Sequence, residues 1–325
     1  MTKSTKDLRI VFMGTPEIAV ASLEAILDAG YNVVGVVTTP DKPAGRGRKV
    51  KESAVKKAAM ERNLNILQPA NLKDIGFIAS LKELNPDLQV IVAFRKVPNE
   101  VWSLPPLGTF NMHASLLPDL RGAAPINWAV IYGYENTGVT TFFINDEIDK
   151  GNILLKEKVE IGKYETAGSL HDKLMITGAK IVVDTIKMIE TGEAEPIPQE
   201  KLESDLPETK PAPKIFKEDC KIQWENTCEK VANFIHGLSP YPGAYAELNI
   251  NDALGPVNYK IFKVECIKEN HSFKPGSVIS DGENEIKIAV IDGFIKVLLI
   301  QEPGKRALSA PEYIRGVKKM NFFKN

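Results

Sequence analysis

The segment from Phe110 to Pro125, FNMHASLLPDLRGAAP, carries polar side chains where a short apolar run ends and a loop begins. Alternate side chains of a strand face the same side, so Asn111 and His113 would lie about 6 to 7 Å apart on one face, with Met112 on the other. An amide and an imidazole held in this way can donate hydrogen bonds to a carbonyl oxygen that becomes negative during attack. The pattern predicts an oxyanion-binding pair for acyl transfer.

A second segment, INDEIDKGNIL from Ile144 to Leu154, predicts a strand that ends in an acidic loop. One of its acids could orient the His113 imidazole and help take a proton from an attacking amine. Asn111, His113 and one carboxylate would then complete an acyl-transfer set. On the residues alone the alternatives stay open, because an isolated N-x-H pair is more often structural and an acidic loop is usually only solvated.

The elements around these segments predict an α/β fold. From Leu8 a short apolar strand, RIVFM, leads into a helix, for which we expect Thr15 as N-cap, Pro16 as the first helical residue and Gly30 as the C-terminal cap. The next strand is VVGVVTT. This β-α-β unit begins a Rossmann-like domain, although the turn at Gly14 lacks the other glycines of a dinucleotide-binding motif.

Further apolar runs predict strands at LQVIVAF, TFNMH and VTTFFI, with a helix around IASLKEL before the first of them. Strands that alternate with helices indicate a parallel-rich sheet covered on both faces. A long amphipathic helix from about Ser169 to Glu190 should close this domain.

The length of 325 residues predicts two domains. We expect a catalytic domain over residues 1–190, a linker rich in proline, glutamate and lysine over residues 191–211, and a second domain over residues 212–325. In the last region a helix near residues 225–237 precedes short runs such as AYAELNI, NYKIFKVECI, EIKIAVI and FIKVLLI. Their alternation with turns predicts a small antiparallel barrel.

Composition narrows the class of protein. The net charge of −1 and pI near 6.5 argue against a protein that coats nucleic acid, although a local basic patch is compatible with them. Cys220, Cys228 and Cys266 show no metal-ligand spacing, so we expect structural thiols in a reducing compartment and no bound metal. With neither a signal peptide nor an apolar stretch of membrane-spanning length, the sequence predicts a cytoplasmic protein without membrane contact.

Several motifs in the same order closely resemble those of the bacterial methionyl-tRNA formyltransferases. They are FMGTPEIA, PDKPAGRGRK, LQPANLKD, NMHASLLPDLRGAAPI, INDEIDKG and HGLSPYPGA. The resemblance implies 10-formyltetrahydrofolate as co-substrate, methionyl initiator tRNA as acceptor, and a catalytic set of Asn111, His113 and Asp149. Asp146 and Glu147 fall outside the family's position. The resemblance also places the folate against Ser115, Leu116, Leu117 and Pro118.

The basic stretch DKPAGRGRKVK, from Asp41 to Lys51, is on charge alone as compatible with a solvated loop as with an RNA contact. Its resemblance to the family's tRNA-contacting loop makes Arg46 the leading contact, together with Lys42 and Arg48. The resemblance further implies an OB-type second domain, whose basic C-terminal residues could bind phosphates. These residues are Lys305, Arg306, Arg315, Lys318, Lys319 and Lys324.

Two positions depart from the family's pattern. Residues 93–97 read AFRKV in place of an AYGxIL-type stretch beside the folate, and His236 stands where an arginine is expected.

The alternatives that we keep are a formyltransferase acting on a sugar amine, a hydrolase of formyl-folate, and an RNA-binding module whose catalytic strand is only structural. We expect the protein to be a monomer.

Overall fold

The computed structural model describes residues 7–44, 49–202, 209–250 and 255–316. The chain forms two compact units whose segments alternate along the sequence. The first consists of Met1–Gly122, Thr137–Val159 and His171–Pro211, and the second of Ala123–Asn136, Glu160–Leu170 and Ala212–Asn325. The expected domain boundaries at residues 190 and 211 stay a prediction.

The first unit is built on a seven-stranded sheet in the order β5-β2-β1-β6-β7-β8-β9. Its strands are β1 (Arg9–Gly14), β2 (Asn32–Val37), β5 (Ile66–Leu67), β6 (Leu88–Val92), β7 (Thr109–His113), β8 (Asn136–Phe143) and β9 (Ile153–Glu160). Pairing is parallel from β5 to β7, and β8 runs antiparallel to β7. The predicted Rossmann-like, parallel-rich fold is confirmed.

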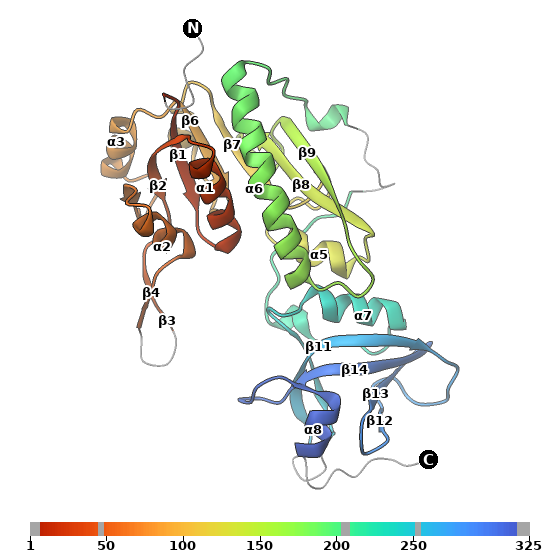
Figure 1. The fold of residues 1–325 in the computed structure, drawn as a ribbon. Helices are drawn as coiled ribbons and strands as arrows, with labels where there is room; N and C mark the ends of the chain where they lie inside the picture. Colours follow the sequence, from red (N-terminus) through yellow and green to blue (C-terminus); the bar gives the residue numbers. More distant parts are fainter. Residues whose placement is uncertain (1–6, 45–48, 203–208, 251–254, 317–325) are drawn as a thin grey trace. The chain divides into compact units, whose positions relative to one another are not determined.

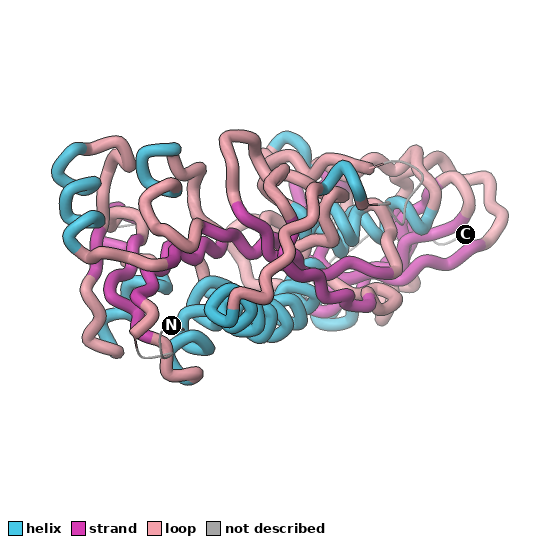
Figure 2. Tube along the Cα trace, turned by 90° about the horizontal axis from the view of Figure 1, so that it is seen from above, coloured by secondary structure: helices cyan, strands magenta, loops and turns pink. Residues whose placement is uncertain are grey.

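Helices cover both faces of this sheet (Figures 1 and 2). They are α1 (Glu17–Asp28), α2 (Ala54–Glu61), α3 (Ile75–Glu83), α4 (Asn99–Trp102) and α6 (Ala167–Thr191). Phe77 of α3 and Val101 of α4 belong to one apolar cluster with Ile91 of β6. On the opposite face, the Thr185 hydroxyl of α6 lies 2.8 Å from that of Thr141 in β8. The Met112 side chain of β7 also lies against Gly178 of α6. Both helical layers therefore cover apolar strand side chains, as a parallel sheet requires.

The ends of α1 only partly follow the prediction. Pro16 is the N-cap, and its extended backbone (φ −85°, ψ −179°) makes Glu17 the first helical residue, so the expected Thr15 cap is wrong by one position. The Pro16 carbonyl accepts the first helical hydrogen bond, from the Ala19 N–H. Gly30 follows the C-cap with φ +83°, a left-handed conformation that glycine adopts without steric cost.

The segment after α6 does not behave as the surface linker that composition predicts. Ile197 pairs with Ile153 through two backbone hydrogen bonds of 2.8 and 2.9 Å. A short 3₁₀ helix, η1 (Gln199–Lys201), follows, and Gln199 is only 2% exposed. Farther along, the Lys210 N–H donates to the Asp119 carboxylate at 2.6 Å. Polar composition alone did not reveal these specific contacts, which bury part of the segment.

The second unit contains a six-stranded antiparallel sheet, in which β10-β11-β14-β13-β12 are neighbours and β15 pairs with β14. The strands are β10 (Ala244–Leu248), β11 (Val257–Lys268), β12 (Val278–Ser280), β13 (Ile286–Val290), β14 (Gly293–Gln301) and β15 (Leu308–Ser309). Helices α5 (Pro125–Ile131), α7 (Cys228–Gly237) and α8 (Ala310–Gly316) and the 3₁₀ helix η2 (Glu218–Cys220) complete the unit. The sheet is consistent with the predicted OB-type fold.

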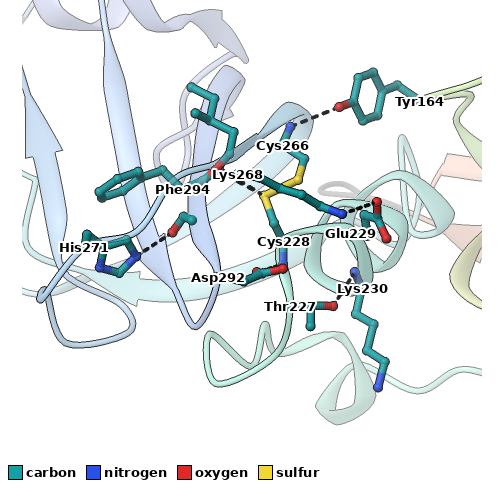
Figure 3. Close-up of a disulfide and its surroundings, with 12 residues drawn as sticks. Tyr164, Thr227, Cys228, Glu229, Lys230, Cys266, Lys268, His271, Asp292 and Phe294 are labelled. Atoms are coloured by element: carbon teal, nitrogen blue, oxygen red, sulfur yellow. Dashed lines mark hydrogen bonds and ion pairs between the residues drawn. A yellow bond between two sulfur atoms is a disulfide. The ribbon is translucent and has the colours of Figure 1, made fainter.

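The expectation of three free thiols is wrong. Cys228, at the start of α7, is joined by a disulfide to Cys266 of β11 (Figure 3). Cys220 is free and buried. Thirty-eight positions separate the two cysteines along the chain, so only the packing of α7 on the sheet brings them together.

Among the described residues, no helix is long and apolar enough to cross a membrane.

Candidate active site

Strand β7 presents the two predicted polar residues on one face of the sheet. Asn111 is opposite Phe142 and His113 is opposite Thr140 on the neighbouring strand β8. Met112 is directed to the other face, which α6 covers, as strand alternation predicts. The Asn111 Oδ1 atom is buried and accepts no hydrogen bond from any residue in the described ranges. A buried amide oxygen that is left without a donor is an acceptor that a ligand or a water molecule can satisfy.

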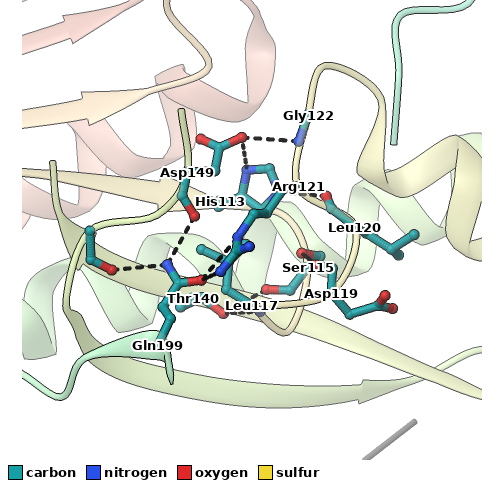
Figure 4. Close-up of polar contacts among 11 residues, drawn as sticks. His113, Ser115, Leu117, Asp119, Leu120, Arg121, Gly122, Thr140, Asp149 and Gln199 are labelled. Atoms are coloured by element: carbon teal, nitrogen blue, oxygen red, sulfur yellow. Dashed lines mark hydrogen bonds and ion pairs between the residues drawn. The ribbon is translucent and has the colours of Figure 1, made fainter. Parts of the chain in front are cut away.

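His113 is buried and held by the loop that follows its own strand. Its Nε2 atom lies 2.9 Å from the Leu120 carbonyl oxygen, which can only accept, so Nε2 carries a proton. The other ring nitrogen, Nδ1, lies 3.9 Å from the Asp149 Oδ2 atom (Figure 4). The carboxylate of Asp149 therefore faces the ring nitrogen that does not bond to the Leu120 carbonyl.

Asp149 is held beside His113 by the backbone. Its Oδ2 atom accepts a hydrogen bond of 3.0 Å from the Gly122 N–H, and its own φ is +56°. Asp146 and Glu147, in the same loop, are exposed. A hydrogen bond from Lys150 lowers the pKa of the Glu147 carboxyl. The structure thus brings one of the three acids to the imidazole and leaves the other two at the surface.

The loop that carries Asp149 closes tightly on the end of β8. The Phe143 N–H donates to the Asn152 carbonyl at 2.9 Å. A Cβ atom on Gly151 would lie 1.6 Å from the Phe143 carbonyl oxygen, a distance that no side chain permits. Glycine at position 151 therefore allows the chain to double back and return Asp149 to the sheet.

The four residues predicted to contact folate fall into two classes. Ser115 and Leu117 are fully buried, and the Ser115 hydroxyl donates to the Asp119 carbonyl at 2.7 Å. Leu116 and Pro118 are half-buried. In this conformation Leu116 and Pro118 retain exposed side-chain surface for a ligand, whereas the side chains of Ser115 and Leu117 are committed to the interior.

Sequence reasoning did not find Gln199 and Arg121. The Gln199 Oε1 atom accepts from Arg121 Nε at 3.1 Å and from Arg121 Nη2 at 2.6 Å. The Gln199 amide also donates to the carbonyl oxygens of Asp149 and Gly151, both at 2.9 Å. A single glutamine in a polar segment carries no pattern that would single it out. Arg121 lies inside the NMHASLLPDLRGAAPI motif, where its charge alone does not distinguish it from a solvated arginine.

The predicted tRNA contacts are only partly visible. Lys42 is exposed on β3 (Lys42–Ala44), which pairs with β4 (Lys49–Lys51) in an antiparallel hairpin. Arg46 and Arg48 lie outside the described residues. In the C-terminal region Arg306 and Arg315 are exposed and Lys305 pairs with Glu302 at 2.8 Å, whereas positions 318, 319 and 324 are not described.

His236 belongs to the core of the second unit, where it is 1% exposed. Its Nε2 atom accepts a hydrogen bond of 3.1 Å from the Val264 N–H. Burial, with a smaller effect of the Lys263 charge, lowers the pKa of His236 to about 4. The ring is neutral in the fold and has a structural role.

Within the described ranges, no three His, Cys, Asp or Glu side chains are grouped as metal ligands.

Comparison with known proteins adds to this geometry. A family model described as formyl transferase matches residues 8–186, and one described as formyl transferase, C-terminal domain, matches residues 214–318. The methionyl-tRNA formyltransferase of Bacteroides thetaiotaomicron is 50% identical over 319 residues, which is 98% of each chain. That of Flavobacterium johnsoniae is 51% identical over 312 residues, 96% of this chain and 97% of its own.

Two solved structures share the fold at low identity. An N-formyltransferase from Helicobacter canadensis, in complex with folinic acid and dTDP-3-aminofucose, has a TM-score of 0.65 and 20% identity, over 89% of this chain and 97% of its own. HypX from Aquifex aeolicus, in complex with tetrahydrofolic acid, has a TM-score of 0.61 and 19% identity, over 97% of this chain and 50% of its own. At these identities the likeness shows the fold.

Proposed function

The chain belongs to the methionyl-tRNA formyltransferase family, and we propose that it transfers the formyl group of 10-formyltetrahydrofolate to the amino group of methionyl initiator tRNA. The observation that carries the proposal is the meeting of an amide, an imidazole and a carboxylate at the end of β7, in a chain about half identical to these enzymes over nearly its whole length. We place the reaction in the cytoplasm, with the enzyme acting as a monomer.

The folate supplies a formyl carbon that an amine can attack. In the proposed reaction a bond forms between the methionyl nitrogen and this carbon, the bond from the carbon to the folate nitrogen breaks, and the amine loses a proton while the folate nitrogen gains one. Asn111 donates a hydrogen bond from its Nδ2 to the formyl oxygen as it becomes negative. Protonated His113 donates from Nδ1, because its Nε2–H is bonded to the Leu120 carbonyl. Because this charge exists mainly in the transition state, these hydrogen bonds accelerate the reaction more than they strengthen binding.

Asp149 acts on His113 in this scheme. Its carboxylate faces Nδ1, at 3.9 Å, so it stabilises the imidazolium and helps to remove the amine proton, directly or through a water molecule. The hydrogen bond from Gly122 N–H holds the carboxylate in place. The residues that would receive the formyl-folate are Leu116 and Pro118, through their exposed surface, together with the backbone of the 115–118 segment.

For the tRNA, we propose that the β3–β4 hairpin approaches the acceptor stem. Three lysines lie on its described part, and Lys42 and Lys51 occupy paired positions, so their charges are close enough to bind neighbouring phosphates. In the sequence, Arg46 and Arg48 fall between these two strands. We propose that Arg46 makes the leading contact.

The test is a transfer assay with formyl-folate and three acceptors: methionyl initiator tRNA, methionyl elongator tRNA and a nucleotide-linked amino sugar. We expect formylmethionyl product with the initiator tRNA and far less with the other two. The control is the Asn111→Ala variant, which keeps the fold and should form product more slowly. Transfer to the amino sugar alone would assign the chain to sugar modification, hydrolysis of the formyl-folate without transfer would indicate a hydrolase, and tRNA binding without chemistry would leave an RNA-binding module.

A further inference from the structure

The segment after α6 holds two loops of the candidate active site together. One is the 119–122 loop, whose Leu120 carbonyl binds His113 and whose Gly122 N–H binds Asp149. The other is the 144–151 loop, which carries Asp149. The segment contacts both loops through Gln199, and it contacts the 119–122 loop again where the Leu120 N–H donates to the Lys210 carbonyl at 2.8 Å. Neither family model includes this segment, because their matches end at residue 186 and resume at residue 214.

Gln199 uses all of its hydrogen-bonding capacity on these two loops. Its two amide hydrogens go to the carbonyl oxygens of Asp149 and Gly151, both at 2.9 Å, and its carbonyl oxygen accepts twice from the Arg121 guanidinium (Figure 4). The side chain is 2% exposed, so these contacts are shielded from water. Removing the amide would leave the buried Gly151 carbonyl oxygen and the partly buried Asp149 carbonyl oxygen without their donor.

The contact with Asp149 acts on a backbone that needs support. Asp149 has a φ of +56°, a conformation that costs about 1 to 2 kcal/mol for a residue with a side chain. In this conformation its carboxylate lies 3.9 Å from His113 Nδ1. The donor on the Asp149 carbonyl and the Gly122 N–H on its carboxylate therefore restrain the residue from both ends.

We propose that Gln199 is a positioning residue for formyl transfer. It contacts none of the reacting atoms. It acts through Asp149, by fixing the carboxylate opposite His113 Nδ1, and it fixes Arg121 so that the 119–122 loop keeps its register. This inference rests on the proposed function, because the loss it predicts is a loss of formyl transfer.

The test compares two substitutions at this position with a matched control. Gln199→Glu keeps the shape and the acceptor for Arg121 but cannot donate to the two carbonyls, and Gln199→Met keeps the length without any polar group. Gln223→Glu makes the same chemical change at an exposed position of the second unit. A misplacement of about 1 Å in a catalytic group can cost about 100-fold, so we expect kcat to fall by about 10- to 100-fold in both Gln199 variants. The KM for folate and tRNA should change less than about threefold, and Gln223→Glu should match the wild type.

A double-mutant cycle separates positioning from a general effect on folding. If Gln199 acts through Asp149, adding Gln199→Met to Asp149→Asn should lower single-turnover rates by less than about threefold. An undiminished loss in that background, or a wild-type kcat in the single variants, would overturn the proposal.

A readout independent of activity is hydrogen exchange at the Gly122 amide, which should be about tenfold faster in Gln199→Met than in Gln223→Glu. Unchanged exchange would also refute positioning. A wild-type protein that forms no formylmethionyl-tRNA would instead refute the proposed function and leave the exchange result to decide the role of Gln199.

Discussion

Acid should destabilise the second unit through a single buried histidine. The His236 pKa is lowered to about 4 in the fold, while in an unfolded chain it is about 6.5. The unfolded chain therefore binds a proton more readily, so the stability that the neutral ring provides is fully present above pH 6.5 and is lost as the pH falls towards 4. The interval between the two pKa values corresponds to about 3 kcal/mol of unfolding free energy. About 2 kcal/mol of this stability should be lost by pH 5.

The structural origin of this effect lies in the hydrogen bonds of the ring. Nε2 accepts from the Val264 N–H, so the proton of the neutral ring is on Nδ1, and within the described residues Nδ1 has no hydrogen-bond partner. Protonation would place a proton on Nε2 against the Val264 N–H and bring a charge into the core, with Lys263 adding repulsion. The Tyr164 ring, whose centroid is 5.7 Å away at an interplanar angle of 62°, leaves Nδ1 without a hydrogen-bond partner among the described residues.

The variant that isolates the effect is His236→Gln. Its carbonyl oxygen can accept from the Val264 N–H, and it cannot gain a charge. Urea unfolding, followed at the buried Trp224 of the same unit, should be measured for both proteins between pH 7.5 and pH 5. The carboxylates titrate equally in the two proteins. As the pH falls, the unfolding free energy of the wild type should therefore decrease by about 2 kcal/mol more than that of the variant.

Two results would refute this reasoning. One is a pair of stability curves that stay parallel, to within about 0.5 kcal/mol, over the whole pH range. The other is a direct titration of the His236 ring by nuclear magnetic resonance, assigned by its absence from the variant, that gives a pKa near 6.5.

Three further predictions concern the site and the cysteines. Asn111→Ala should lower turnover by about 10² to 10³ without loss of fold, because one oxyanion donor is removed, and near-normal turnover would exclude Asn111 from the reaction. Arg46→Ala should lower kcat/KM for the tRNA more than it weakens folate binding, and an unchanged kcat/KM for the tRNA would contradict the role of the β3–β4 hairpin. In denaturant without reductant, alkylation should modify Cys220 but neither Cys228 nor Cys266, and labelling of all three would refute the disulfide.

The sequence determined the order of the main elements because their signals are local. Alternation of apolar residues gave β7 and the face shared by Asn111 and His113, and the periodicity of the 169–190 stretch gave α6. The short elements β5, α2 and α5 were not predicted, since each is too brief for a periodic pattern to emerge. The cap of α1 shifted by one residue because the extended backbone of Pro16 excludes it from the helix.

What the tertiary structure decided is which distant groups meet. The acidic loop offered three carboxylates of equal chemistry. Spacing could not choose among them, and the resemblance to a family singled out Asp149, the acid whose carboxylate the folded chain brings to His113. The pairing of Cys228 with Cys266, and the burial of Gln199 in a segment whose composition predicts exposure, likewise depend on contacts between residues far apart in the chain. Composition and periodicity report how a residue relates to its sequence neighbours, whereas a hydrogen bond across 50 positions, from Gln199 to Asp149, exists only once the chain has folded.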